Sequence, residues 1–301
     1  MDTDLDTLAT ALYVTCDDLL KAHPEQVPAR PVSGFVPETS DAELVTLAVM
    51  QALLGYTSEA RWLRRAHKDF HSMFPHLPRQ SGYNKRLRKL AGVMGWLVGQ
   101  LAALTSVFTD DVWLVDSTPV ECARSRETVK RSDLAGWAEY GYCASHSRWF
   151  WGLRLHLVAT LHGLPIGWAL TGAKADEREV LRALLPLLPP RAGKQLVLAD
   201  KNYYGREFEA DLADHEIGVI RPTRKGETER AGHQFLRPLR QTIESIFDTF
   251  KDQLDLERHG GRTVGGVTAR VAQRVLALTA AIWHNDHTGA PVLRSLVAYD
   301  H

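Results

Sequence analysis

The sequence predicts an α/β protein in which a mixed sheet flanked by helices follows a smaller, all-helical N-terminal region. Two observations carry this prediction. Residues 1–110 hold apolar residues at helical spacing, whereas short strand-like and helix-like segments alternate beyond residue 110. A composition of 45% hydrophobic and 24% charged residues over 301 positions is ordinary for a globular protein, which excludes the disordered and fibrous classes.

The N-terminal region begins one of its helices with a clear capping signal. Ser40 followed three residues later by Glu43 forms a capping box, which predicts a helix that starts near Asp41. A second helix is expected across residues 58–70. A third is expected to begin near Ser81, after two prolines that interrupt the chain.

The uncharged stretch 91–109 is nearly as long as a membrane span. Gly92, Gln100, Thr105 and Ser106 dilute its hydrophobicity, and the chain holds one such stretch. Glycines at close spacing serve helix packing in a soluble core as well as in a membrane. We therefore expect a buried helix here and no membrane partner.

The second region reads as a strand, a hairpin, and then helices alternating with strands. The first strand is expected at 112–117, and a short glycine-containing connection at 161–163 joins the next two strands into a hairpin. The remaining expected strands are 149–160, 164–171, 195–200 and 217–222, and the expected helices are 176–188, 205–215, 238–254 and 267–284. The predicted division is a helical domain at 1–110, an α/β domain at 111–290 and a C-terminal tail at 291–301.

Charge is distributed unevenly although the net charge is zero. Residues 1–60 carry ten acidic against two basic side chains, and residues 61–90 carry nine basic against one acidic. A basic patch of this density is compatible with a helix-turn-helix-like unit that binds DNA. The alternative is a helical packing domain with a solvated basic face. The candidate DNA contacts in the third helix are Lys85, Arg86, Arg88 and Lys89.

The segment 124–148 is too irregular for an assignment of secondary structure. It places Arg124 and Arg126 close to Lys130 and Arg131. Two interpretations stay open: a solvated loop, and a loop that contacts DNA beside an active site.

Neither a disulfide framework nor a zinc site is indicated, because the three cysteines are widely spaced and lack ligand spacing. The first residues are acidic where a signal peptide would be basic, which predicts a cytoplasmic protein.

Three acidic residues stand in settings that suggest a metal site. Asp116 lies within an apolar strand-like run, Asp200 ends a second such run, and Glu244 lies on a predicted helix. A carboxylate beside a buried strand is costly unless a partner or a metal compensates it. Each also has a structural interpretation: a strand-end hydrogen bond, a turn cap, and an ion pair between Arg240 and Glu244.

The predicted helix 238–254 presents its charged residues beside an apolar stripe. Arg240, Glu244 and Lys251 fall on one face, so Glu244 would reach the two aspartates while Arg240 and Lys251 hold phosphates. Three converging carboxylates suit hard cations, and two Mg²⁺ or Mn²⁺ ions roughly 4 Å apart would clamp a phosphoryl displacement.

The combined pattern resembles the bacterial insertion-sequence transposases of the DDE class. The resemblance rests on Arg240-x3-Glu244-x6-Lys251, on Asp116 in a Val-Asp-Ser-x-Pro strand and on Asp200 in an Ala-Asp-Lys-x-Tyr strand end. It covers roughly residues 40–285. Two positions depart from the family pattern: Arg237 stands where a tyrosine is frequent, and Asn202 where a glycine is frequent.

The resemblance implies a ribonuclease H-like catalytic domain and a DNA-cutting activity. Asp116, Asp200 and Glu244 would bind two metal ions and catalyse hydrolysis at the ends of a mobile element, and the exposed 3′-hydroxyls would attack target DNA. Lys201 joins the candidate DNA contacts. The implied partners are double-stranded DNA, as terminal repeats and target, and a second copy of the chain in a homodimer. Two alternatives remain: a nuclease of the same fold without strand transfer, and an inactive, domesticated transposase that only binds DNA.

Overall fold

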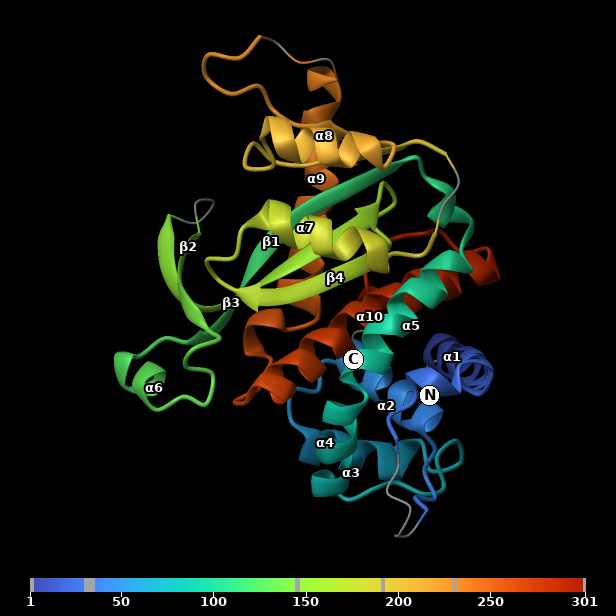
Figure 1. Ribbon diagram of the computed structural model, residues 1–301. Coiled ribbons are helices and arrows are strands. Elements are labelled where there is room, and N and C mark those ends of the chain that lie inside the picture. Colours follow the sequence, from blue (N-terminus) through green and yellow to red (C-terminus); the bar gives the residue numbers. More distant parts are fainter. Residues whose placement is uncertain are drawn as a thin grey trace.

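A six-stranded mixed sheet lies at the centre of the computed structural model, which describes residues 3–29, 36–143, 147–190, 193–228, 230 and 232–299 (Figure 1). The strands are β1 (Val112–Ala123), β2 (Glu139–Cys143), β3 (Arg148–Thr160), β4 (Pro165–Gly172), β5 (Gln195–Leu198) and β6 (Ile217–Ile220). The α-helices are α1 (Thr3–Ala22), α2 (Asp41–Leu53), α3 (Glu59–Asp69), α4 (Gln80–Lys89), α5 (Ala91–Ala103), α6 (Arg126–Lys130), α7 (Glu177–Leu184), α8 (Arg206–Asp214), α9 (His233–Asp248) and α10 (Val264–Thr288). Short 3-10 turns lie at Pro24–Gln26, Ser106–Thr109, Leu185–Leu187, Leu256–Arg258 and Val297–Tyr299, and a π-helical turn at Thr249–Gln253.

The sheet has the topology of the ribonuclease H-like fold. Its strand order is β4-β3-β1-β5-β6. The pairs β4–β3 and β3–β1 are antiparallel, and the pairs β1–β5 and β5–β6 are parallel. Strand β2 pairs with the first part of β3, and β4 pairs with the rest of β3 along the same edge. The mixed sheet confirms the fold class predicted from the sequence.

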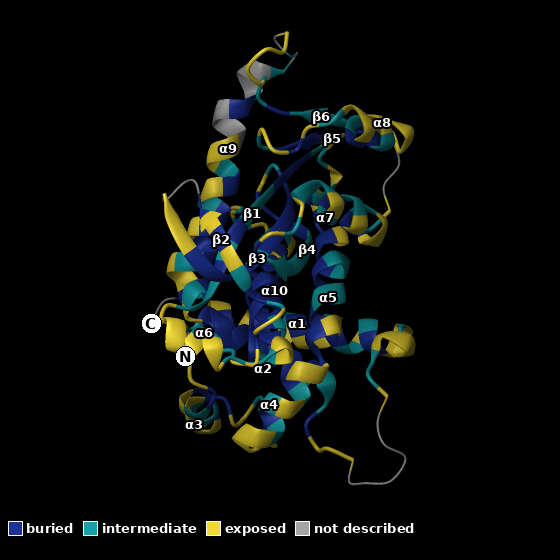
Figure 2. Ribbon diagram, turned by 60° about the vertical axis from the view of Figure 1, so that its left-hand side comes forward, coloured by how far each residue is buried: buried dark blue, intermediate teal, exposed yellow. Residues whose placement is uncertain are grey.

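Helices cover both faces of the sheet. In two views α7 lies on one face and α9 on the other (Figures 1 and 2). Helix α9 packs on β1 because Ile243, Ile246 and Phe247 form a buried stripe along it. Helix α5 packs against β4, so the helical region lies against the edge of the sheet opposite β6.

Helix α10 joins the helical region to the α/β region. It packs on α5 and α2, and nearly its whole length is buried (Figure 2). Buried Arg270 forms an ion pair with Glu59 at the start of α3, and Gln273 donates to the Ala48 carbonyl at 2.6 Å. These bonds satisfy polar groups that would be costly unpaired, so they fix α10 against α2 and α3. One hydrophobic core runs through both regions, and the domain boundary near residue 110 stays a prediction.

Most expected elements are present, with bounds that differ by a few residues. The capping box at Ser40 and Glu43 is confirmed, and Asp176 caps α7 by accepting from the Arg178 N–H at 2.9 Å. The 91–109 stretch forms α5 followed by a 3-10 turn, and among the described helices none is long and apolar enough to cross a membrane. The irregular segment after β1 holds α6 and β2, which the sequence did not predict.

The pairing of β3 with two strands predicts a strict requirement for glycine at position 152. Gly152 faces Glu121 on β1 and Glu139 on β2, and an added Cβ would lie 2.1 Å from the Val120 carbonyl oxygen. We expect Gly152→Ala to lower the free energy of unfolding by about 3 kcal/mol, because backbone must shift to accept the methyl group. Denaturant unfolding followed by circular dichroism measures this change.

The matched control is Gly92→Ala on α5, where an added Cβ meets nothing within 4 Å. Alanine is the better helix former, so the control should leave stability unchanged or raise it by at most about 1 kcal/mol. Equal unfolding midpoints for Gly152→Ala and the unmodified protein would contradict the packing described for β1 and β3.

Candidate active site

The parallel pairing of β1 with β5 brings Asp116 and Asp200 to the same end of the sheet. The last paired positions are Leu114 and Leu198, and each aspartate follows two residues later. Both side chains are partly buried. The predicted convergence of two strand carboxylates is therefore present in the structure.

Electrostatics couple the two aspartates. The pKa of Asp116 is raised to about 7, chiefly by burial. The Ser117 N–H and the Arg240 guanidinium lower this pKa, and the carboxylates of Asp200 and Glu177 raise it. Burial and Glu177 also raise the pKa of Asp200, against the Asn202 N–H, Arg240 and Lys201. These groups thus form one charge cluster drawn from β1, β5, α7 and α9.

Glu177 links the segments that carry the two aspartates. It accepts from the Ser117 hydroxyl at 2.5 Å, from Arg154 at 3.4 Å and from the Asn202 side chain at 3.5 Å. Arg154 also donates to the Ser117 hydroxyl at 2.9 Å. Ser117 adjoins Asp116, and the Asn202 N–H donates to Asp200 Oδ1 at 2.7 Å. Glu177, in the first turn of α7, therefore ties together the two segments that carry the aspartates.

Asn202 occupies the position where a glycine was expected, yet its backbone is not left-handed. The Asp200 carboxylate accepts the Asn202 N–H and closes the turn instead. At the second departure from the family pattern, the side chain of Arg237 lies outside the described part of the structure.

Helix α9 places Arg240 and Glu244 one turn apart on its exposed side. Arg240 lies close enough to both aspartates to affect their pKa values, whereas Glu244 points to solvent. The main groups that shift the pKa values of the two aspartates include Glu177 and Arg240 but not Glu244. Ile243, Phe247, Phe250 and Leu254 are buried, which confirms the predicted apolar stripe.

Lys251 lies in the π-helical turn that follows α9. A π-helical turn is wider than an α-helical turn, so it rotates Lys251 away from the face that a regular helix would give it. Lys251 lines a pocket of about 680 Å³ together with Arg148, Asp248 and Arg258, among others. Its role in holding phosphate stays a prediction.

The residues expected to contact DNA differ in their exposure and in their contacts within the protein. Arg86 is partly buried and donates to Asp41 at 2.5 Å and to the Thr39 carbonyl at 2.8 Å, which anchors α4 to the start of α2. Arg124 is exposed and lies 3.5 Å from Glu121. The exposed candidates are Lys85, Arg88, Lys89, Arg124, Arg126 and Lys201. Their contact with DNA stays a prediction.

The chemistry of the cluster suits a hard divalent cation. Carboxylate oxygens are the ligands that Mg²⁺ and Mn²⁺ prefer, and a cation would relieve the repulsion between Asp116 and Asp200. The buried Tyr203 hydroxyl lacks a hydrogen-bond partner among the described residues, and burial with the nearby carboxylates raises its pKa well above the usual value. No group of three potential ligands in the described part of the chain has metal-binding geometry. The two aspartates therefore fit the cation in ligand type, and the third ligand is not in position.

Comparison with known proteins identifies the family. A family model described as a transposase DDE domain matches residues 108–280, more than half of the chain. The chain belongs to the DDE transposase family. This domain spans β1 to most of α10 and contains Asp116, Asp200 and Glu244. The match confirms the DDE class that the sequence motif indicated.

Two further comparisons add little to the family assignment. No curated protein matches the sequence. A similar solved structure is a cryo-EM structure of the piggyBac transposase synaptic complex with hairpin DNA, at a TM-score of 0.37 and 7% identity. The similarity covers 95% of this chain and 80% of that chain.

The structure places four residues beside the two aspartates that the sequence did not single out: Ser117, Arg154, Glu177 and Tyr203. Glu177 gave no signal because an acidic residue in the first turn of a helix is common for capping alone. Arg154 is a charged residue in the interior of a largely apolar strand, and that pattern was the available signal.

The Glu177 bridge predicts a large loss of stability when its carboxylate is removed. Arg154 and Glu177 are largely buried, at 17% and 15% side-chain exposure. Glu177→Ala leaves the Arg154 charge without its carboxylate, and we expect a loss of about 3 kcal/mol in the free energy of unfolding. Chemical denaturation measures it, and a double-mutant cycle with Arg154→Ala should show a smaller loss than the sum of the two.

Glu179→Ala is the control on the same helix, since Glu179 is 63% exposed and its pair with Arg182 is on the surface. Its effect should stay below about 0.5 kcal/mol. If Glu177→Ala is no more destabilising than Glu179→Ala, Glu177 does not hold the two strand ends together.

Proposed function

We propose that this transposase moves a bacterial insertion sequence, by metal-dependent hydrolysis of DNA at the element ends followed by strand transfer. The observation that supports it most directly is the convergence of Asp116 and Asp200, with Arg240 beside them, inside the matched DDE domain. Two carboxylates with raised pKa values lie at the same end of the sheet, and such a pair is suited to binding cations.

Glu244 is the third carboxylate of this proposal. Glu177 is nearer to the aspartates, but its oxygens already accept from Ser117, Arg154 and Asn202. Glu244 is exposed and lies one helical turn from Arg240, whose guanidinium is close to both aspartates. A change of side-chain rotamer on a fixed helix is a small motion compared with breaking the Glu177 bridge.

The residues of the chain have different roles in the two phosphoryl transfers. Asp116, Asp200 and Glu244 hold two Mg²⁺ or Mn²⁺ ions, which supply charge neutralisation and activation of the attacking oxygen. Arg240 and Lys251 hold DNA phosphates, Arg240 through a two-pronged contact. In the first transfer, water attacks a phosphorus at the element end and the 3′-oxygen of the element strand leaves. In the second transfer, the 3′-hydroxyl released in this way attacks a phosphodiester of target DNA, and the 3′-oxygen of the target strand leaves.

DNA at the element ends and at the target is the proposed partner, and a homodimer would hold two ends together. The proposed DNA contacts are exposed basic residues: Lys85, Arg88, Lys89, Arg124, Arg126 and Lys201. Arg86 is included with them, although its engagement with Asp41 makes it the weakest candidate.

The test is cleavage of a labelled duplex that carries the gene's own flanking DNA, in Mg²⁺ and in EDTA. We expect nicking at the element boundary and joined products in Mg²⁺ alone. Asp116→Asn and Glu244→Gln should each lower both products by at least about a hundredfold, because each removes a charge needed in the transition state. Glu207→Gln, an exposed change on α8, is the control and should keep full activity.

The outcomes separate the competing functions. Nicking without joined products would support a nuclease of the same fold. Binding without cleavage in Mg²⁺ or Mn²⁺ would support a protein that only binds DNA. Full activity of Glu244→Gln would remove Glu244 from the site.

A further inference from the structure

Helix α3 carries a continuous stripe of basic side chains. Arg61, Arg64, Arg65 and Lys68 follow the i, i+3, i+4, i+7 spacing of one helical face, and all four are exposed. At 1.5 Å rise per residue the stripe is roughly 10 Å long, close to the width of about 12 Å of the major groove of DNA. We call these four residues the α3 basic stripe.

The opposite side of α3 is fixed in the protein. Trp62 and Ala66 are fully buried, and Glu59 in the first turn forms a buried ion pair with Arg270 of α10. Tyr83 of α4 is buried beside the same network, where it donates to Gln51 at 2.9 Å. The basic stripe therefore sits on a rigid support, and presenting it to a partner costs no ordering of the helix backbone.

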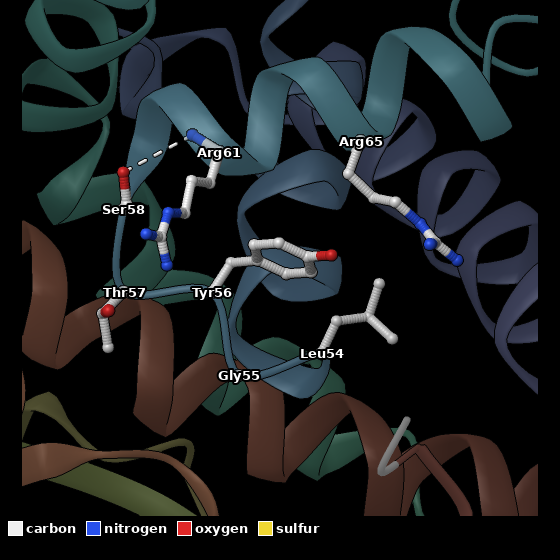
Figure 3. A pocket seen from close by; sticks show the side chains of 7 residues that line it. All are labelled: Leu54, Gly55, Tyr56, Thr57, Ser58, Arg61 and Arg65. Atoms are coloured by element: carbon white, nitrogen blue, oxygen red, sulfur yellow. Dashed lines mark hydrogen bonds between the residues drawn. The ribbon is translucent and has the colours of Figure 1, made fainter.

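A pocket opens at the N-terminal end of the stripe. It has a volume of about 340 Å³ and lies between α3 and the turn that joins α2 to α3. Figure 3 shows Arg61 and Arg65 descending from the same side of α3, with the ring of Tyr56 between them. The residues that line it are Leu54, Gly55, Tyr56, Thr57, Ser58, Arg61 and Arg65.

Most of the positive charge on this face is not neutralised by the protein. Arg65 is paired with Asp69. Arg61, Arg64 and Lys68 have no carboxylate within ion-pair distance among the residues that the structure describes. Like charges at these spacings repel one another, so binding of a polyanion stabilises this face.

We propose that the α3 basic stripe docks on the phosphate backbone of double-stranded DNA and that the adjoining pocket receives one phosphate between Arg61 and Arg65. The choice of DNA as the ligand rests on the proposed function. The surface itself rests on the charge pattern, the fixed orientation of α3 and the pocket. It places the main DNA contact of the helical region on α3, whereas the candidates chosen from the charge of the sequence lie on α4.

The test is binding of labelled duplexes by fluorescence anisotropy in EDTA, so that no cleavage is needed. One duplex carries the gene's flanking DNA and another has a random sequence. We expect Arg61→Gln/Arg64→Gln to bind both duplexes at least about tenfold more weakly. The slope of log affinity against log salt should decrease in magnitude by about 1.8, or about 0.9 for each lost phosphate contact.

Lys21→Gln/Arg206→Gln is the matched control, since it removes two exposed positive charges from α1 and α8. It should bind like the unmodified protein. Circular dichroism spectra should be alike for all variants because the changed side chains are exposed.

Two results would overturn the proposal: no change for Arg61→Gln/Arg64→Gln, or an equal loss for the control pair. A result that contradicts the proposed function can be distinguished from results that contradict DNA binding by α3. Asp116→Asn should bind the duplexes normally, so a protein that binds through α3 and never cleaves DNA would contradict the transposition proposal alone.

Discussion

The parallel hydrogen bonding between β1 and β5 is the constraint on which the site depends. It fixes Asp116 and Asp200 at equivalent positions beyond the last paired residues, Leu114 and Leu198. Strand pairing has a side-chain period of two, so a register shift of one residue would turn one aspartate to the opposite face. The helices on either side add to this pair. Helix α9 brings Arg240 from one face, and α7 brings Glu177 from the other.

The resulting cluster concentrates negative charge in a partly buried position. The residues around the two aspartates form a buried group and an exposed group. Arg154 and Glu177 form a hydrogen-bonded bridge that holds the strand ends in place. Arg240 and Glu244 lie on the exposed side of α9 and are available to DNA and to metal ions. The buried groups are costly to rearrange and the exposed groups are not. Under the proposed function, this division lets a rigid pair of aspartates coexist with an exposed third carboxylate, Glu244.

The candidate site residues that depend on local pattern could be predicted from the sequence. Asp116 and Asp200 interrupt or end apolar strands, and Glu244 belongs to a spaced helical motif, so each was visible in the chain. Contacts between distant segments were not visible. Glu177 meets Ser117 across 60 positions, and Arg86 meets Asp41 across 45, so neither role follows from neighbouring residues. The short strand β2 was missed because its aromatic and glycine residues lie in an irregular basic segment. The core that joins α10 to α2 is likewise a property of the folded chain.

The central claim is that Asp116 and Asp200 together bind a divalent cation. Titration of the protein with Mn²⁺, with the free ion followed by electron paramagnetic resonance, tests it without DNA. The account predicts saturable binding that Asp116→Asn and Asp200→Asn each weaken by at least about tenfold, while Asp214→Asn at the exposed end of α8 leaves it unchanged. Equal Mn²⁺ binding by the unmodified protein and both aspartate variants, with all of them folded, would contradict it.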